Sequence, residues 1–329
     1  MIVLFGVFLL TLLVMTAVAV VRSENLFVAA MLTGIFSLLL AALFFILDAP
    51  DVALTEAAVG AGISIVLFLA ALALTAERER GGTAKPLLAL GVVAVTTMIM
   101  IYASFEKPRF GDSLAPIHVH VAPWYLERTP EVIEIPNVVT AVLASFRGYD
   151  TLGEVFVVFT AGIGVLFLLG KRPRRESEPI DVSLDQADVG LRHYLIPRVV
   201  GRLLVPFIVL FGLYVQFHGD YGPGGGFQAG ALIASGIILY ALLEGEVRAL
   251  QVLPAWLLTG LVAGGALLYG AVGVACMLLG GNFLDYSVLA SDPISGQHLG
   301  ILLIEAGVGI TVTGVLLSVF HAFAARGSD

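Results

Sequence analysis

Charged residues are scarce in this chain of 329 residues, where Asp, Glu, Lys and Arg together make up only 13% of the sequence. Soluble globular domains carry roughly 25% charged residues, so too few remain here to cover a surface that faces water. Hydrophobic residues reach 59%, and the mean hydropathy is +1.00. The composition therefore excludes an ordinary soluble domain and indicates that lipid is the main solvent.

Cysteine is almost absent, since Cys276 is the only one. A single thiol excludes an intrachain disulfide, a four-cysteine iron–sulfur cluster and a cysteine-rich zinc site. Because Cys276 lies within an apolar run, we expect a small buried side chain. Basic residues are also few, and 17 Lys and Arg against 25 Asp and Glu form no basic stripe. We therefore expect no nucleic-acid partner.

Residues that would mark an enzyme or a lysine-relay pump are missing as well. Lys85, Lys107 and Lys171 all lie at the ends of apolar runs or between them, which disfavours a self-contained proton pump. His118 and His120 lack a third ligand for a metal, and no Ser–His–Asp or Cys–His arrangement has a supporting context. We predict no catalytic site, no metal site and no cofactor.

Long apolar runs dominate the sequence instead. A bilayer core of about 30 Å requires about 20 apolar residues in a helix, and barrel strands would have to alternate, which these runs do not. The sequence therefore predicts an all-α integral membrane protein with about nine transmembrane helices. The predicted helices cover residues 1–21, 25–47, 52–75, 86–104, 150–170, 200–217, 226–243, 254–279 and 299–323.

The distribution of basic residues predicts the orientation. With nine helices, one set of loops and the C-terminus together hold 13 of the 17 basic residues. The remaining four all fall in the segment 105–149. Because positive charge stays on the cytoplasmic side, we predict the N-terminus outside and the C-terminus inside, in a multi-pass protein of the cell membrane.

Two long connections divide the predicted helices. Segment 105–149 lies on the outer side, and its apolar part at 137–146 either enters the membrane or lies along its surface. No internal repeat is evident, which weakens an inverted-repeat transporter. The predicted domains are a three-helix segment at 1–80, a two-helix segment with the long outer loop at 81–170, a charged cytoplasmic linker at 171–199 and a four-helix domain at 200–329.

Glu56 is the first of four candidate positions, because a carboxylate within a span is costly unless it is paired or hydrated. It lies about one turn, or ~6–8 Å, inside the third predicted helix. Small residues from Ala53 to Ser64 favour close helix packing, so Glu56 should face protein. It is either a proton or cation relay or a carboxylate favoured by the helix dipole. Asp51, directly after Pro50, is interpreted as a cap or turn residue.

Asp150 and Glu154 form the second candidate position. Thr151 and Glu154 match the capping-box spacing, which would explain Glu154 as a helix-start residue without a transport role. Arg147 and Asp150 are spaced to pair across the turn. Both acidic residues remain candidates for ion translocation.

The third position is a glycine-rich run between two apolar helices, at 216–228, which contains His218 and Asp220. Glycine and proline end a helix and allow a tight turn or re-entry, and non-helical backbone near the membrane persists only where it is packed in protein or lines water. A phosphate loop is excluded because no Gly-Lys-Ser/Thr follows. The run is either a structural turn or the mouth of a conduit.

Glu305 is the fourth position and the strongest single candidate. It lies about seven residues, or ~10 Å, into the last predicted helix. Gly307 and Gly309 follow it, and because they lack side chains the helix is narrower there. No other carboxylate in the chain is predicted to lie so deep in a span. It serves either in a translocation route or as an idle protonated acid.

Three segments of the chain resemble a known family. Residues 25–75, with the Pro-Asp-Val-Ala-Leu-Thr-Glu-Ala-Ala-Val-Gly motif at 50–60, resemble the C-terminal end of the large first subunit of Mrp-type multisubunit Na⁺/H⁺ antiporters, a segment that forms the separate MbhD protein in related membrane-bound hydrogenases. Residues 137–154 are similar to the MbhE-type segment that follows. From about residue 202, the glycine-rich run and the helix around Glu305 resemble the MnhB/MrpB domain.

The resemblance implies a fused subunit that accompanies antiporter-like pumping subunits and small helical subunits and helps to form the Na⁺ or H⁺ route. It implies that the acidic positions of the family correspond to Glu56, Asp150 and Glu154 in this chain. The last helix of the family more usually has Asp where this chain has Glu305, whose side chain is longer by one methylene. The alternative is a membrane-arm subunit of a redox-driven complex of the hydrogenase type, which acts mainly as a scaffold.

Three roles remain open from the sequence. The carboxylates Glu56, Glu154 and Glu305 face a hydrated path in a conduit-forming subunit. In a structural subunit they cap helices and bond them to each other. In a membrane anchor for a redox enzyme, the linker from Lys171 to Glu178 docks a cytoplasmic partner.

Overall fold

Helices account for almost all of the regular structure. The computed structural model describes residues 2–75, 78–79, 86–109, 111–169 and 194–327. Within these ranges the β pairing consists of an isolated bridge between Asn25 and Arg78. Most of the predicted linker at 171–199 lies outside the described residues.

The predicted fold class is confirmed, because nine helices in the described part of the chain are long and apolar enough to cross a membrane. The third span is built from three consecutive pieces, the middle one a π-helix. The spans are α1 (Ile2–Arg22), α2 (Leu26–Ile46), α3–η1–α4 (Pro50–Thr55, Glu56–Ile63 and Ser64–Leu72), α5 (Pro86–Phe105), α8 (Gly148–Leu169), α9 (Leu195–His218), α10 (Gly226–Glu244), α12 (Ala255–Leu278) and α13 (Pro293–Gly327).

The last helix starts six residues before its predicted start at residue 299, at Pro293. Asp292 lies directly before this helix and accepts hydrogen bonds from the backbone N–H of Ser295 at 2.9 Å and from its hydroxyl at 2.7 Å. Proline suits the first helical position because its missing N–H would have no partner there. Hydropathy alone missed this start because the first turns of α13 are polar.

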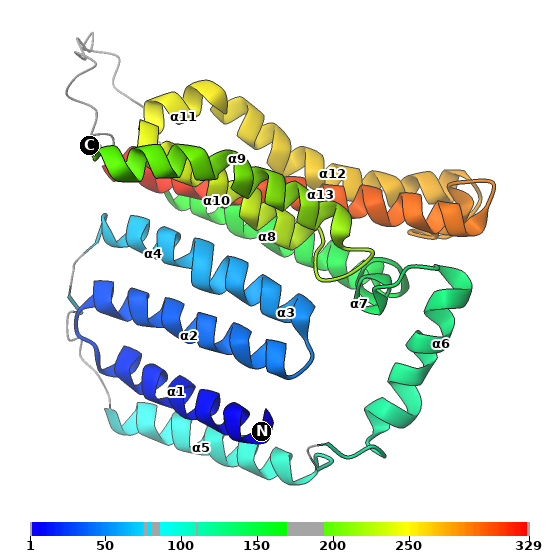
Figure 1. Ribbon diagram of the computed structural model, residues 1–329, viewed down its shortest axis with the longest axis horizontal. Coiled ribbons are helices and arrows are strands. Elements are labelled where there is room, and N and C mark those ends of the chain that lie inside the picture. Colours follow the sequence, from blue (N-terminus) through cyan, green and yellow to red (C-terminus); the bar gives the residue numbers. More distant parts are fainter. Residues whose placement is uncertain (1, 76–77, 80–85, 110, 170–193, 328–329) are drawn as a thin grey trace.

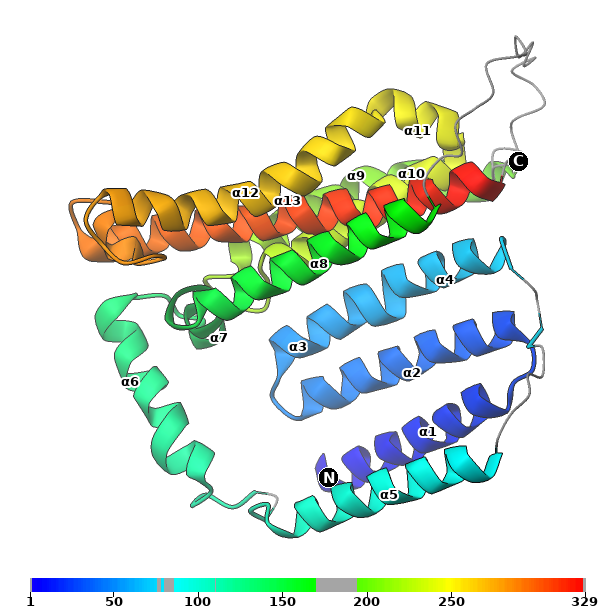
Figure 2. The ribbon, with the colours of Figure 1, turned by 180° about the vertical axis from the view of Figure 1, so that it is seen from behind.

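The C-terminal spans form one bundle around α13, which packs against α8, α10 and α12 (Figures 1 and 2). Beside the bundle, α1 packs on α2, and α2 packs on the α3–η1–α4 helix, which in turn contacts α10 and α13. Every residue of α5 is exposed. The N-terminal spans therefore form a layer attached to the bundle through α3, η1 and α4.

The outer segment returns the chain from α5 to the bundle. It contains the π-helix η2 (Ile117–Val121) and then α6 (Ala122–Val132), which runs across the ends of the spans (Figure 1). The short helices α7 (Val138–Thr140) and η3 (Ala141–Phe146) follow, and Ala141 is fully buried. The apolar part at 137–146 thus packs within protein against α8 and α13.

The largest core lies between α8, α12 and α13. Tyr269 and Tyr286 are fully buried in it, and their hydroxyls donate to the carbonyls of Gly148 at 2.7 Å and Ala144 at 3.0 Å. Cys276 is fully buried in the same core, which confirms its prediction. The bundle is completed by two short helices, α11 (Glu246–Val252) and the 3₁₀-helix η5 (Tyr286–Val288).

Candidate functional site: an acidic cavity between the helices

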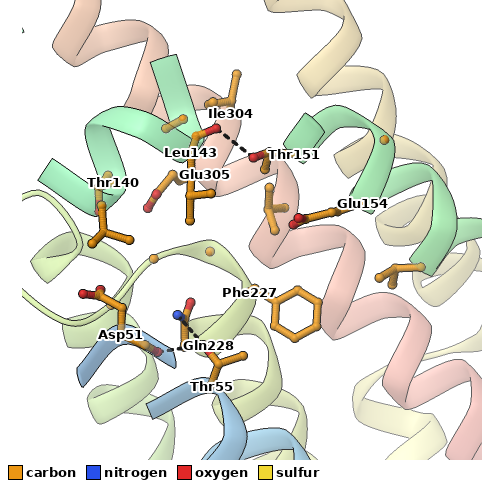
Figure 3. A pocket seen from close by; sticks show the side chains of 18 of the residues that line it. Asp51, Thr55, Thr140, Leu143, Thr151, Glu154, Phe227, Gln228, Ile304 and Glu305 are labelled. Atoms are coloured by element: carbon orange, nitrogen blue, oxygen red, sulfur yellow. Dashed lines mark hydrogen bonds between the residues drawn. The ribbon is translucent and has the colours of Figure 1, made fainter. Parts of the chain in front are cut away.

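A cavity of about 670 Å³ lies where α3, α7, η3, α8, α10 and α13 meet. Three carboxylates from different helices line it, those of Asp51, Glu154 and Glu305 (Figure 3). The described lining contains no Lys, Arg or His side chain. The other polar side chains in the lining are those of Thr55, Thr140, Thr151 and Gln228.

The glycine-rich loop before α10 lies directly on Glu305. A Cβ placed on Gly219 or Gly225 would lie 3.1 and 3.2 Å from the carboxylate oxygens of Glu305. A Cβ on Gly226 would collide with the carbonyl oxygen of Glu305 and with the side chain of Val308. Gly225 also has a φ of +123°, which residues with a side chain rarely adopt. The glycines therefore allow the loop backbone to approach the α13 carboxylate closely.

Asn137 ties three parts of the chain together beside this loop. Its Nδ2 donates to the carbonyl oxygens of Gly219 at 3.0 Å and Gly222 at 2.9 Å, and to Oδ1 of Asp51 at 3.3 Å. Its Oδ1 accepts from two backbone N–H groups at the start of α7 and so caps that helix. With 8% exposure, Asn137 is a buried hub that holds Asp51 against the loop.

Gln228 connects the cavity to the third span. Its Nε2 donates to Oγ1 of Thr55 at 2.8 Å (Figure 3). Thr55 donates in turn to the carbonyl of Asp51 at 2.9 Å. Asn137, Thr55 and Gln228 were not predicted as site residues, although Gln228 is an amide inside an apolar span. Asp51 was interpreted as a cap or turn residue, but it lies within the first turn of α3, whose N-cap is Ala49, and it lines the cavity.

Glu154 lines the cavity from α8, and its alternative interpretation as a capping-box residue is wrong. The helix begins at Gly148, so Thr151 lies inside it and donates its hydroxyl hydrogen to the carbonyl of Leu143 at 2.8 Å. The carboxylate of Glu154 is therefore directed to the cavity, as Figure 3 shows. Asp150 is ion-paired with Arg147, as its spacing predicts, and it does not line the cavity.

Glu56 lies outside the cavity lining, at the start of η1. A Cβ on Gly60 would lie 2.5 Å from Oε1 of Glu56 and 2.7 Å from Oγ of Ser37 on α2. The carboxylate therefore faces protein, in agreement with the small residues around it. The π-helical hydrogen bonding of η1 is a form that recurs at functional sites in helices.

His218 is the last residue of α9 and Asp220 lies in the loop that follows, and neither lines the cavity. The ring of His218 stacks on that of Tyr214, with centroids 4.8 Å apart, and its carbonyl accepts the backbone N–H of Tyr221 at 2.9 Å and of Gly222 at 3.0 Å. This arrangement favours the structural turn. Burial raises the pKa of Asp220, and the nearby His298 opposes that rise.

The cavity presents carboxylate, hydroxyl and amide groups to any small species that enters it. A water molecule occupies about 30 Å³ in the liquid, so the cavity has room for several waters. Carboxylates within a span are costly unless water or a partner charge compensates them. Among the described residues, no group of three acidic, His or Cys side chains is close enough together to hold a metal ion. The carboxylates are spread along the cavity instead, with hydroxyl and amide groups between them.

Three family models match consecutive parts of the chain. The MbhD model, which describes the D subunit of MBH, matches residues 11–77, and the MbhE model, which describes the E subunit of MBH, matches 87–187. The third, "Domain related to MnhB subunit of Na+/H+ antiporter", matches 196–318. Asp51 falls in the first of these segments, Glu154 in the second and Glu305 in the third. The cavity is therefore formed at the junction of all three matched segments.

Some curated relatives are named as antiporter subunits. A protein of Rhizobium meliloti, named as a probable K⁺/H⁺ antiporter A/B subunit, is 27% identical over 85% of this chain and 30% of its own length. A Staphylococcus aureus protein, named as a putative mnhB2 subunit of an antiporter, is 35% identical over 37% of this chain and 88% of its own length. The chain thus spans about a third of the longer relative and most of the shorter one.

Two solved structures contain a chain with a similar fold. The Mrp complex from Dietzia sp. DQ12-45-1b contains a chain with a TM-score of 0.76 and 26% identity, which covers 96% of this chain and 34% of that one. The archaeal membrane-bound sulfane sulfur reductase contains a chain with a TM-score of 0.55 and 28% identity, which covers 73% of this chain and 98% of that one.

Proposed function

Because this chain belongs to the family of MnhB-type antiporter subunits, we propose that it is a membrane subunit of a multisubunit cation/proton antiporter and that its acidic cavity forms part of the Na⁺ or H⁺ route. The observation that carries this proposal is the cavity itself, where Asp51, Glu154 and Glu305 meet. Its partners are other membrane subunits of the same complex, because the relatives include an Mrp complex and antiporter subunits. The role is transport rather than catalysis.

Glu305 is the central group of the proposed route. It lies inside α13, against the glycine loop, and the described lining supplies no basic side chain to neutralise it. A carboxylate in this setting binds a proton or a monovalent cation more readily than it stays ionised and bare. Glu154 and Asp51 extend the acidic lining on the other walls. Glu56 belongs to the same proposal as a relay on the third span, beside the cavity.

The proposed orientation has the N-terminus outside and the C-terminus inside. The acidic cavity lies toward the end of the spans where α6, α7 and the glycine loop gather (Figure 1). In this orientation that end is the outer side, so the cavity is the outer part of the route.

The experiment compares Glu305→Gln with wild type in vesicles that contain the whole complex, using an imposed pH gradient and no electron donor. We expect Na⁺- or K⁺-dependent proton movement to fall to the level of vesicles without the complex, while a native gel shows normal assembly. Glu305→Asp keeps the carboxylate and should retain transport. Asp150→Asn is the matched control, because it removes a carboxylate on α8 that lies outside the cavity. Normal transport by Glu305→Gln would refute the route.

A redox-driven scaffold is the second candidate, favoured by the 98% coverage of the sulfane sulfur reductase chain. In that case the wild-type vesicles move no protons until an electron donor is supplied. Under that role, Glu305→Gln lowers the amount of assembled complex, and its transport per assembled complex stays unchanged. The two candidates therefore differ in both readouts.

A further inference from the structure

A second charged cluster lies at the opposite end of the bundle from the glycine loop. Glu244, the last residue of α10, is 4% exposed and is surrounded by three arginines. Arg202 donates from its Nε to Oε1 of Glu244, and Arg248 donates to Oε2 at 3.0 Å. Arg198 lies one turn before Arg202 on α9, and its Nε is 3.8 Å from Oε1. We call these four residues the arginine cluster.

The arginine cluster carries an excess of positive charge. Among the described side chains, Glu244 is the carboxylate that all three guanidinium groups share. One negative charge thus compensates three positive ones. The Nε of Arg198 is buried and has no hydrogen-bond partner among the described residues. A guanidinium group presents five donors, and three such groups offer more donors than Glu244, the acceptor they share among the described side chains, can take.

The cluster lies at the ends of candidate membrane spans. Arg198 and Arg202 are in the first turns of α9, Glu244 is the last residue of α10, and Arg248 follows it on α11. Tyr194 before α9 is 63% exposed, and Trp256 at the start of α12 is 75% exposed. Exposed Tyr and Trp at span ends are typical of the boundary between headgroups and acyl chains.

Apolar side chains continue from the cluster along the span. Leu195 and Val199, on α9 beside Arg198, are 73% and 58% exposed, and Leu203 is 64% exposed. A soluble anion would gain nothing from this surface, whereas an acyl chain would cover it. Arginine forks match the geometry of phosphate oxygens, and basic groups between helix ends bind anionic lipid headgroups.

We propose that the arginine cluster binds the phosphate of an anionic lipid headgroup, with Arg198 and Arg248 as the contacting residues and the apolar face of α9 along an acyl chain. Glu244 pre-orients the guanidinium groups and holds α9 against α10. The site is separate from the acidic cavity, so its occupation does not depend on the proposed transport role. Phosphate is the recognised group, and its source is a lipid rather than a soluble anion.

The test uses the purified full chain in detergent and native mass spectrometry with dioleoyl-phosphatidylglycerol as the probe. We expect a saturable lipid adduct that dioleoyl-phosphatidylcholine does not form. Arg198→Gln should weaken it by about fivefold, because a basic residue near anionic headgroups contributes about 1 kcal/mol. This variant leaves the hydrogen bonds of Arg202 and Arg248 to Glu244 in place. Arg22→Gln, at the end of α1, is the matched control for loss of one charge and should bind as wild type does.

Each outcome decides the proposal. Equal binding by Arg198→Gln and wild type, or equal adducts with both lipids, would overturn it. Glycerol 3-phosphate is added as a competitor, and displacement of the lipid at equal concentration would assign the cluster to a soluble phosphate and overturn the lipid source. A thermal unfolding curve identifies any variant that fails to fold, and Arg248→Gln then serves as the second test of the same contact.

Discussion

Asn137→Asp is the sharpest perturbation of the site, because it changes one amide into a carboxylate of the same shape. The Oδ1 that caps α7 is kept, so the helix cap survives. The Nδ2 donor is lost, although it serves Gly219, Gly222 and Asp51. The substitution therefore separates the capping role of Asn137 from its role as the hub between segments.

The expected magnitude follows from the lost Nδ2 group, whose two hydrogens serve three acceptors. A neutral hydrogen bond contributes about 1 kcal/mol net, so the loss lowers the free energy of unfolding by about 2 kcal/mol. The new carboxylate would also face two carbonyl oxygens and the carboxylate of Asp51, which adds to the loss. Protonation restores one donor, so the destabilisation should shrink as the pH falls.

Thermal unfolding of the purified chain in detergent measures this effect, with an expected midpoint roughly 5–10 °C lower at neutral pH. Asn25→Asp is the matched control. Oδ1 of Asn25 caps α2 by accepting the N–H of Val28 at 3.1 Å, and among the described residues its Nδ2 donates none of the hydrogen bonds that Asn137 makes. This control should unfold as wild type does. If Asn137→Asp also unfolds as wild type does, Asn137 does not hold the segments together and the hub assignment is refuted.

Three further substitutions test the packing around the cavity and the cluster. Gly226→Ala should destabilise by about 1–3 kcal/mol through its collision with α13, whereas Gly260→Ala, with open space around it, should be neutral in the same unfolding assay. Tyr269→Phe removes a buried hydroxyl that donates to an α8 carbonyl and should cost about 1–2 kcal/mol of unfolding free energy. Arg202→Gln should lower the unfolding midpoint by leaving a buried carboxylate with fewer partners, and Glu244→Gln in the same chain should restore part of it.

The spans were predictable because they depend on local composition. Mean hydropathy over about 20 residues reflects the free energy of transferring a helix from water into lipid. It predicted all nine candidate spans in the described residues. The start of α13 was missed because Asp292 and Pro293 stabilise it by capping the helix, and a hydropathy average does not measure capping. The position of Glu305 within a span was also predictable, because a carboxylate in an apolar run stands out in the sequence.

The assembly of the site was not predictable, because its contacts join distant parts of the chain. Asn137 forms hydrogen bonds to Gly219 and Asp51, which are separated from it by 82 and 86 positions in the sequence. Gln228 forms a hydrogen bond to Thr55 across a separation of 173 positions. No local pattern marks such partners. The glycine run was visible as a break between helices, but its contact with Glu305 depends on how α9, α10 and α13 pack.

The position of the cavity gives a structural reason for joining the three segments in one chain. Its walls carry Asp51 from the first matched segment, Glu154 from the second and Glu305 from the third. A chain made of the MnhB-type domain alone holds Glu305 and the glycine loop but lacks the other two carboxylates. Such a chain could complete the cavity only if a neighbouring subunit supplied the walls that α3 and α8 provide here. Joining the segments in one polypeptide makes that association intramolecular, which raises the effective concentration of the parts to about the millimolar range or above.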